Sequence, residues 1–500
     1  MVKNPAMEAF MAQFPQQGLT FDDVSLVTAY ADFLPDDTEL TSRLSRRIDL
    51  GIPFVSAAMD TVTEADMAIA IALQGGIGVI HKNLSPKAQA EEVGRVKHYL
   101  NGLIPDPVTF PHSIKVRELL ATREERDYQF AGFPILDDGD RLVGILTSRD
   151  IRFLTDLDVA VSDVMTTDLL VGTPGTSIRE AFDTMLKHKV GKLPIIDDDR
   201  KLLGLYSFSD VKTIIENMEP TFNRDSNHRL RVAAAVGPND EERFEPLAAQ
   251  DVDAMVIDTA HGHSKGVLDT IRALKHTYPD IDVIAGNIAT AEAATALVEA
   301  GADAVKVGIG PGSICTTRVI AGVGVPQITA VYEVSRAVGD TVPVIADGGV
   351  SYSGDAAKAL AVGADAVMMG SVLAGTEESP GETILHQGRT YVAYRGMGSL
   401  DAMRTGKGSR ERYGQHNVLD PDKLVPQGIE GLIPYRGKVA DVLHQYCGGL
   451  RFSLGYCGAR NIPDFQRRAR FVRISSASLR EAHPHDVKII KDAPNYRSSS

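Results

Sequence analysis

A glycine-rich loop that carries one thiol is the part of this sequence best suited to covalent chemistry. Residues 306–318 read K-V-G-I-G-P-G-S-I-C-T-T-R, so Cys315 follows three glycines and precedes two threonines. The glycines let a phosphate or an ion approach the backbone closely, and the threonine hydroxyls can donate hydrogen bonds to a group that the thiol attacks. A buried structural thiol explains this loop alone equally well, so the surrounding elements must decide.

The composition excludes several classes of protein. The chain has 500 residues, more than one ordinary domain, with 43% apolar and 24% charged residues. A net charge of −14 argues against nucleic-acid binding. The sequence has no apolar run long enough to cross a membrane and no signal peptide at its start. Three cysteines do not make a disulfide framework. We therefore expect a cytoplasmic protein, in which a free thiol is stable.

Short apolar segments alternate with helical segments along most of the chain. This alternation predicts an α/β fold, specifically a (β/α)₈ or TIM barrel, with a mixed open sheet as the alternative. Polar and glycine residues gather where the strands end, which is where such barrels place their active sites. The expected strands lie within residues 52–60, 75–81, 231–237, 254–258, 283–287, 304–310, 342–349 and 366–371.

An internal repeat interrupts this alternation. Residues 133–151 match residues 193–211 at an offset of 60, and each copy reads as a strand, an Asp-rich turn, a strand and a helix. Two such units can pack into a module of their own. We therefore expect a module inserted in the barrel. The predicted divisions are residues 1–104 for the first part of the barrel, 105–218 for the module, with its copies at about 105–163 and 164–218, and 219–500 for the rest.

The repeat resembles a tandem pair of cystathionine-β-synthase (CBS) domains. That resemblance implies binding of purine nucleotides of the ATP or GTP class, with Asp150 and Asp210 holding ribose hydroxyls. Both aspartates lie near expected helix starts, so they are also explained as simple N-caps.

Two motifs end the last two barrel strands. Asp347-Gly-Gly and Gly370-Ser371 stand where barrels of this class hold phosphates. The negative charge of Asp347 suits ribose hydroxyls better than a phosphate, and the same holds for Asp258 toward a second ligand.

The loop around Cys315 resembles the catalytic loop of the inosine-5′-monophosphate (IMP) dehydrogenase family. The similarity begins with GIGPGSICTTRVIAGVGVPQITAVYE and covers essentially the whole chain, through DGGVSYSGD, MMGSVLAGTEESPGE, YRGMGSL, GGLRFSLGYCGA and ARFVRISSASLREAHPHDV. It implies oxidation of IMP to XMP with NAD⁺ and water, the committed step of guanine nucleotide synthesis. In that reaction Cys315 attacks C2 of the purine, hydride passes to NAD⁺, and water releases the product from the thiol.

The resemblance also implies roles for individual residues. The catalytic set is Cys315 and Thr317, together with Arg412 and Tyr413 on a mobile flap at about residues 385–435. The implied cofactor contacts are Asp258, Thr259, Asn287, Gly308 and Gly310. The implied substrate contacts are Ser56, Met59, Ser313, Asp347, Gly349, Gly370, Ser371, Tyr394, Gly396, Met397, Gly398 and Gln427.

Arg412 is an unusual base because the reference pKa of arginine exceeds 12. It needs burial against the intermediate, or a proton path through Thr317. Position 427 holds Glu or Gln in the family, and Gln427 cannot act as a carboxylate base. We therefore expect the path through Thr317 to be weak and Arg412 to be the more important group.

A K⁺ site is implied as well. Its ligands are carbonyl oxygens of Gly310, Gly312 and Cys315, completed by Glu481, Ala482 and His483 of a neighbouring subunit, and carbonyl cages suit K⁺. A homotetramer, or an octamer of two tetramers, follows from that shared site. The other two thiols, Cys447 and Cys457, have no metal-site spacing around them and are expected to be structural.

Two other functions remain open at this point. Guanosine monophosphate (GMP) reductases share the barrel and the thiol but deaminate their substrate with NADPH, and the Arg412-Tyr413 pair favours the dehydrogenase over them. A non-catalytic nucleotide sensor built on the CBS-like repeat is the second alternative. Intact Cys315 and Thr317 argue against it, because a sensor has no physical need of them.

Overall fold

The computed structural model describes residues 4–15, 17–99, 102–126, 128, 132–152, 154–216, 222–227, 229–418, 420–490 and 493–496. The chain divides into two compact units. The first comprises residues 1–97, 221–225 and 230–500, and the second comprises residues 98–220 and 226–229.

The first unit is built on a closed barrel of eight parallel strands. Their order around the barrel is β12-β13-β14-β15-β16-β17-β4-β5, so the two strands that precede the second unit in the sequence close the ring. The predicted (β/α)₈ barrel is confirmed, and the open-sheet alternative is excluded. The strands are β4 (Phe54–Ser56), β5 (Ile77–Ile80), β12 (Ala233–Val236), β13 (Ala254–Asp258), β14 (Asp282–Ile288), β15 (Ala304–Val307), β16 (Val344–Asp347) and β17 (Ala366–Met369).

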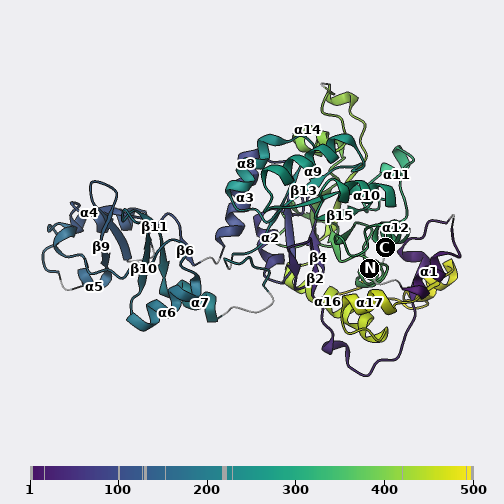
Figure 1. Cartoon of the computed structure of the whole chain (residues 1–500), viewed down its shortest axis with the longest axis horizontal. Coiled ribbons are helices and arrows are strands. Elements are labelled where there is room, and N and C mark those ends of the chain that lie inside the picture. Colours follow the sequence, from purple (N-terminus) through teal and green to yellow (C-terminus); the bar gives the residue numbers. More distant parts are fainter. Residues whose placement is uncertain are drawn as a thin grey trace. The chain divides into compact units, whose positions relative to one another are not determined.

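Helices surround these strands (Figure 1). They are amphipathic: the buried side chains of α9 include Val267, Ile271 and Leu274, at the spacing of one helical face. The helices of the barrel are α2 (Ala65–Ala72), α3 (Pro86–His98), α8 (Glu241–Ala249), α9 (Lys265–Thr277), α10 (Ala291–Glu299), α11 (Thr317–Ile320), α12 (Gln327–Val338) and α13 (Ser353–Ala361), and α16 (Val439–Tyr456) and α17 (Ile462–Arg468) pack on α13.

The alternation of side chains along the strands produces two apolar layers. Val256, Ala304 and Ile345 belong to the cluster inside the barrel, whereas their neighbours Ile257, Val305 and Val344 belong to the layer under the helices. The residue two positions after each inner residue also faces inward. This parity directs three charged side chains into the barrel at the carboxyl ends of its strands: Asp258, Lys306 and Asp347.

The flap segment, defined here as residues 383–434, carries more regular structure than its sequence indicated. Strands β18 (Thr383–His386), β19 (Arg389–Arg395) and β20 (Glu430–Pro434) form an antiparallel sheet. Between β19 and β20 lie two short helices, α14 (Leu400–Thr405) and α15 (Lys407–Arg412). The polar, glycine-containing sequence gave no periodicity that predicts either helix.

The second unit shows the sequence repeat as repeated structure. In each copy two antiparallel strands pair in the same register, with Pro134 opposite Ile145 and Pro194 opposite Leu205. The two copies have separate apolar clusters. The elements are β6 (Leu103–Ile104), β7 (Phe110–Pro111), α4 (Val116–Glu125), β8 (Gly132–Leu136), β9 (Leu142–Thr147), α5 (Ser148–Ile151), α6 (Ile178–His188), β10 (Lys192–Ile196), β11 (Leu202–Ser207) and α7 (Phe208–Glu216).

The remaining elements belong to the first unit. No described helix is both long and apolar enough to cross a membrane. The remaining helices are α1 (Pro5–Met11) and α18 (Ser476–Ala482). The remaining strands form two pairs: β1 (Val24–Leu26) with β21 (Phe471–Arg473), and β2 (Ser42–Arg43) with β3 (Asp49–Leu50).

Candidate functional site

A buried lysine joins three of the barrel strands at their carboxyl ends. The Nζ of Lys306 donates to Asp258 Oδ1 at 3.0 Å and to Asp347 Oδ2 at 2.5 Å, and it also donates to Asn287 Oδ1. Asn287 in turn donates from Nδ2 to Asp347 Oδ2 at 2.8 Å. The lysine side chain is 1% exposed, so its charge requires these partners. The network fixes the orientation of both carboxylates before any ligand binds.

Sequence reasoning gave Lys306 no role. The local signal was a single charged residue within an apolar strand, A-V-K-V, and a fully buried lysine nearly always has an ionic partner. The two carboxylates that pair with Lys306 lie on strands 48 and 41 residues away in the sequence.

The thiol loop is held by the flap segment. Cys315 Sγ lies 3.1 Å from Thr317 Oγ1 and 3.7 Å from the carbonyl oxygen of Gln427. The backbone of Thr316 donates to that same carbonyl at 3.0 Å, and Ile429 donates to the carbonyl of Ile314 at 3.0 Å. The start of the thiol loop also needs a glycine, because a Cβ at Gly308 (φ +157°) would overlap the backbone of Asp347.

A cavity of about 110 Å³ brings the thiol together with the residues predicted around it. It combines a nucleophile, a carboxylate and a guanidinium in one enclosed space. Of the predicted site residues, those that line it are Met59, Asn287, Gly308, Gly310, Gly312, Cys315, Asp347, Tyr394, Gly396, Met397, Arg412, Tyr413 and Gln427.

Other predicted substrate residues lie outside this cavity. Ser56 is fully buried, and its hydroxyl oxygen accepts a hydrogen bond from Thr63 at 2.9 Å. Ser371 lines a separate cavity of about 320 Å³. Gly370 borders Tyr394, since a Cβ there would lie 3.0 Å from the phenol oxygen. The predicted substrate-binding residues that do not line the thiol cavity are Ser56, Ser313, Gly349, Gly370, Ser371 and Gly398.

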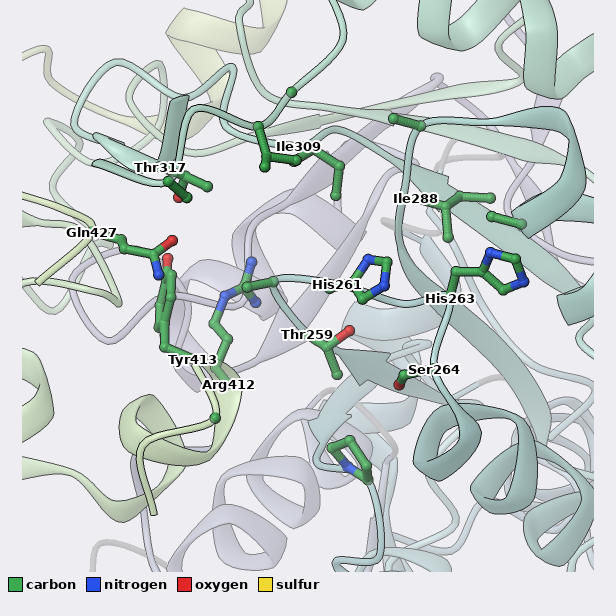
Figure 2. Close-up of a pocket in the computed structure, with 18 of the residues that line it drawn as sticks. Thr259, His261, His263, Ser264, Ile288, Ile309, Thr317, Arg412, Tyr413 and Gln427 are labelled. Carbon is green, nitrogen blue, oxygen red and sulfur yellow. The ribbon is translucent and has the colours of Figure 1, made fainter. Parts of the chain in front are cut away.

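A second, larger cavity of about 1200 Å³ adjoins the first, because both are lined by Arg412, Tyr413 and Gln427. Figure 2 shows Arg412 and Tyr413 entering it from the flap segment, and Thr259, His261, His263 and Ser264 from the chain that follows β13. Its volume exceeds the ~300–1,000 Å³ of most small-molecule sites. Sequence reasoning missed His261 and His263, although they follow the predicted Asp258-Thr259 pair by a few residues.

Arg412 is anchored at the boundary of the two cavities. Its Nη1 pairs with Asp258 Oδ2, and its backbone carbonyl accepts from Ala260 N at 3.1 Å. The guanidinium Nε is buried and has no hydrogen-bond partner among the described residues. The neighbouring Tyr413 ring lies against Gly398, where a Cβ would be 2.6 Å from the ring, and burial raises the pKa of Tyr413.

A second buried lysine contacts the backbone of Asp258, the residue that pairs with Arg412. Lys82 follows β5, and its Nζ donates to the backbone carbonyl of Asp258 at 3.1 Å. Burial, and to a smaller extent the nearby Arg412 charge, lower the pKa of Lys82 from 10.5 to about 7. Nothing in the sequence distinguished Lys82 from an ordinary surface lysine.

The aspartates predicted to bind nucleotide in the second unit stand at helix starts. Asp150 accepts from the backbone N of Thr147 at 2.6 Å and from Thr166 Oγ1 at 3.0 Å. It therefore completes a capping box at the start of α5 as the N3 residue, whereas the N-cap itself is Thr147. Asp210, in the first turn of α7, accepts from Ser209 Oγ at 3.2 Å. The nucleotide role of both residues stays a prediction.

The residues predicted to hold K⁺ lie in two separate places in the sequence. Within the thiol loop, Gly312 accepts from Cys315 N at 3.1 Å, and Gly310 has φ +69°. Glu481 and Ala482 end α18, followed by His483, whose Nδ1 is 3.0 Å from Tyr496 Oη. The described residues contain no cluster of three or more His, Cys, Asp or Glu that could hold a metal ion. The K⁺ site stays a prediction.

Comparisons with known proteins agree with this geometry. Residues 18–485 match the family model described as IMP dehydrogenase / GMP reductase domain. Inosine-5′-monophosphate dehydrogenase of Aquifex aeolicus (strain VF5) is 52% identical over 487 residues, which cover 96% of this chain and 98% of the relative. Its counterpart in Bacillus subtilis (strain 168) is 50% identical over 498 residues, with 98% and 99% covered.

A solved structure is similar over the same length. A GMP reductase variant from Trypanosoma brucei, in complex with guanosine 5′-monophosphate, has 37% sequence identity and a TM-score of 0.81, with 96% of this chain and 100% of that chain covered. The family resemblance read from the sequence is therefore confirmed across nearly the full length. This chain belongs to the IMP dehydrogenase / GMP reductase family.

Proposed function

We propose that this oxidoreductase converts IMP to XMP with NAD⁺ and water, through a covalent bond between Cys315 and C2 of the purine. The observation that carries the proposal is the shared lining of the thiol cavity, where Cys315 and Arg412 meet. The relatives at about 50% identity over nearly the whole chain, which are named as IMP dehydrogenases, support the same reaction. The product places the enzyme at the committed step of guanine nucleotide synthesis.

The first half-reaction uses the thiol loop. Cys315 Sγ forms a bond to C2, and the hydrogen on C2 leaves with its electron pair. The residues that line the larger cavity would hold NAD⁺, which would supply the hydride acceptor for this step. The size of that cavity and its shared boundary with the thiol cavity suit a dinucleotide whose reactive end must reach C2. Asp347, already oriented by Lys306 and Asn287, offers a fixed acceptor for the ribose hydroxyls of IMP.

The second half-reaction uses the flap segment. A water molecule adds to C2, a base removes its proton, and the C2–S bond breaks to restore the thiolate and release XMP. Arg412 is our candidate for this base, because its guanidinium reaches the thiol cavity and carries one buried, unpartnered nitrogen. The ion pair with Asp258 favours the charged guanidinium. We infer that Arg412 first leaves Asp258 and releases its own proton to solvent, and that the neutral guanidine then takes the proton from the attacking water.

We infer that Asp258 determines the order of the two half-reactions. It is our proposed ligand for the cofactor ribose, yet in this structure its Oδ2 is paired with Arg412. Because one carboxylate oxygen cannot serve both groups in the same geometry, cofactor and Arg412 alternate at Asp258. The flap segment then enters after NADH leaves.

Further partners are part of the proposal. We infer that K⁺ is held by carbonyls of Gly310, Gly312 and Cys315, since neutral carbonyl donors suit this cation, with Glu481–His483 of a neighbouring subunit in a homotetramer. The second unit binds purine nucleotides as a CBS-type regulatory module. Three free cysteines agree with a cytoplasmic enzyme.

A single experiment separates the candidate reactions. The purified enzyme receives IMP and NAD⁺, with K⁺ and then with Na⁺, and NADH formation is followed by absorbance. In parallel it receives GMP and NADPH. NADH formation that requires K⁺ supports the dehydrogenase and its cation. NADPH consumption with GMP alone assigns a GMP reductase, as in the solved structural relative. Bound nucleotide without either reaction indicates a sensor.

A further inference from the structure

The side chain of Asn83 joins the barrel to the flap segment. Its Nδ2 donates to Asp60 Oδ2 at 2.7 Å, and its Oδ1 accepts from the backbone N of Ser409 at 2.8 Å. Asp60 is also paired with Arg395, at the end of β19, at 2.7 Å. The carboxamide thus uses one donor and one acceptor to connect the loop after β5 with helix α15.

Two glycines allow this contact to be close. A Cβ at Gly408 would lie 2.5 Å from the backbone oxygen of Lys82, and a Cβ at Gly406 would overlap the Asn83 carboxamide. Gly406 has φ −126°, which any residue adopts, and Gly408 lies within α15. Neither position needs glycine for its backbone conformation, and glycine inside a helix is unfavourable. The glycines therefore serve the docking of α15 onto residues 82 and 83.

The same loop also contacts the strand end that carries Asp258. Lys82 Nζ donates to the Asp258 carbonyl at 3.1 Å, while the other end of α15 places Arg412 on the Asp258 carboxylate. One short loop thereby contacts both the helix that carries Arg412 and the backbone of Asp258, whose carboxylate pairs with Arg412.

We propose that Lys82 and Asn83 form a latch that holds α15 against the barrel and so positions Arg412 for hydrolysis. Asn83 is a positioning residue: it lines neither cavity and acts through α15. This inference rests on the proposed function. Hydride transfer takes place with the cofactor at Asp258 and does not need the latch, whereas release of XMP from Cys315 does.

Two variants test the latch in the full-length enzyme. Asn83→Ala removes the bridge, and Gly408→Ala blocks docking without removing any side chain while keeping a good helix former in α15. Gly431→Ala is the matched control, because it lies in the same flap segment and its added Cβ meets nothing within 4 Å. Rapid mixing with IMP and NAD⁺ gives the NADH burst, the steady state gives hydrolysis, and acid quenching gives the fraction of enzyme bound covalently to purine.

Both latch variants are expected to keep a burst of near-normal rate and amplitude. Their steady-state rate should fall about tenfold, as expected for loss of one partly buried hydrogen bond in the closed state, and the covalent fraction should rise. Gly431→Ala should match the wild type in all three measurements. If Asn83→Ala does not fold, Gly408→Ala decides alone.

Two results overturn the latch. One is an unchanged steady state in Gly408→Ala, and the other is a burst that disappears together with turnover, which indicates damage to the site. A wild-type enzyme that forms no NADH from IMP and NAD⁺ contradicts the proposed function itself, so failure of the latch and failure of the function give different results.

Discussion

Asp258 receives hydrogen bonds from three cationic side chains that come from distant parts of the chain. Lys306 donates to one carboxylate oxygen, Arg412 pairs with the other, and Lys82 donates to the backbone carbonyl. The carboxylate stabilises two of these charges directly, and Asp347 shares Lys306. The third, Lys82, donates to a neutral carbonyl, and burial lowers its pKa by more than the nearby Asp240 and Glu411 raise it.

Replacement of the nucleophile tests the chemistry at this scale. Cys315→Ala should lower turnover by more than about 10³-fold, because no other group near C2 can form the covalent bond. The dissociation constant for IMP should change by less than about tenfold, or ~1.4 kcal/mol, because the other residues that line the cavity remain. Steady-state NADH formation and calorimetric IMP binding measure the two effects. Cys447→Ala is the control, since burial raises the pKa of that thiol to about 12; an active Cys315→Ala enzyme contradicts the covalent mechanism.

Lys82 gives a prediction for the pH dependence of stability. Its pKa is about 7 in the folded enzyme and about 10.4 in an unfolded chain. Between these values the unfolded chain binds more protons, so the contribution of Lys82 to the free energy of unfolding increases as pH rises. Relative to that of Lys82→Met, the free energy of unfolding of the wild type should increase by up to about 1.4 kcal/mol per pH unit in this window. Denaturant titrations of both proteins at pH about 7.5 and about 9.5 measure it. A difference that does not vary with pH means that Lys82 stays charged.

At the scale of elements, the barrel positions the substrate side of the site and the flap segment positions the hydrolytic side. Strand parity carries Asp258, Lys306 and Asp347 to one end of the barrel. The flap segment adds Arg412 through α15 and steadies the thiol loop through the Gln427 carbonyl. In the proposed mechanism, the two half-reactions therefore depend on different elements.

Removal of the flap guanidinium should separate these halves. Arg412→Ala is expected to keep the NADH burst but to slow steady-state turnover by about 10²-fold or more, the usual contribution of a positioned base. Stopped-flow absorbance resolves the two phases. The control is Arg404→Ala, which removes an exposed arginine from α14 in the same segment, where its pairing with Asp422 contributes little. If the burst rate and the steady-state rate fall equally, Arg412 acts in hydride transfer instead.

The sequence predicted the barrel strands but not the network between them. Each strand is a short apolar run, and most of these runs end in Gly, Asp or Asn, so the local pattern is enough to locate them. The partners of Lys306 are set by the closure of the barrel, which no local pattern contains. Helices α14 and α15 escaped prediction because Gly406 and Gly408 weaken any helical signal, and α15 is stabilised by contacts with Lys82 and Asn83, more than 300 residues earlier. The Arg412-Tyr413 assignment came from family resemblance, not from chemistry.

At the scale of the whole molecule, the chain consists of two units with their own apolar clusters. Within the first unit, Lys97, the last residue before the second unit, lies next to residues 221–225, where the chain returns. There Lys97 pairs with Asp225 at 3.1 Å and Asn223 donates to the carbonyl of Gly76 at 2.9 Å. The barrel therefore holds the two ends of the insertion close together by itself.

Excision of the second unit should leave the chemistry intact. In a variant with residues 99–220 replaced by a short Gly-Ser linker, NADH formation from IMP should stay within about threefold of the wild type, because the ends to be joined are already close. Any response to added ATP or GTP should disappear. Steady-state assays of both proteins, with and without nucleotide, measure the change. A nucleotide response that survives excision would assign it to the barrel.

The shared use of Asp258 by Arg412 and the proposed cofactor also governs inhibition. A compound that occupies the larger cavity and needs this carboxylate binds only molecules whose flap segment is open. Its apparent affinity is the intrinsic affinity reduced by the open fraction. Two related enzymes with identical cavity residues can therefore differ in inhibitor sensitivity through residues such as Asn83, which lines neither cavity. Selective inhibitors of this enzyme then depend on flap equilibria as much as on the shape of the pocket.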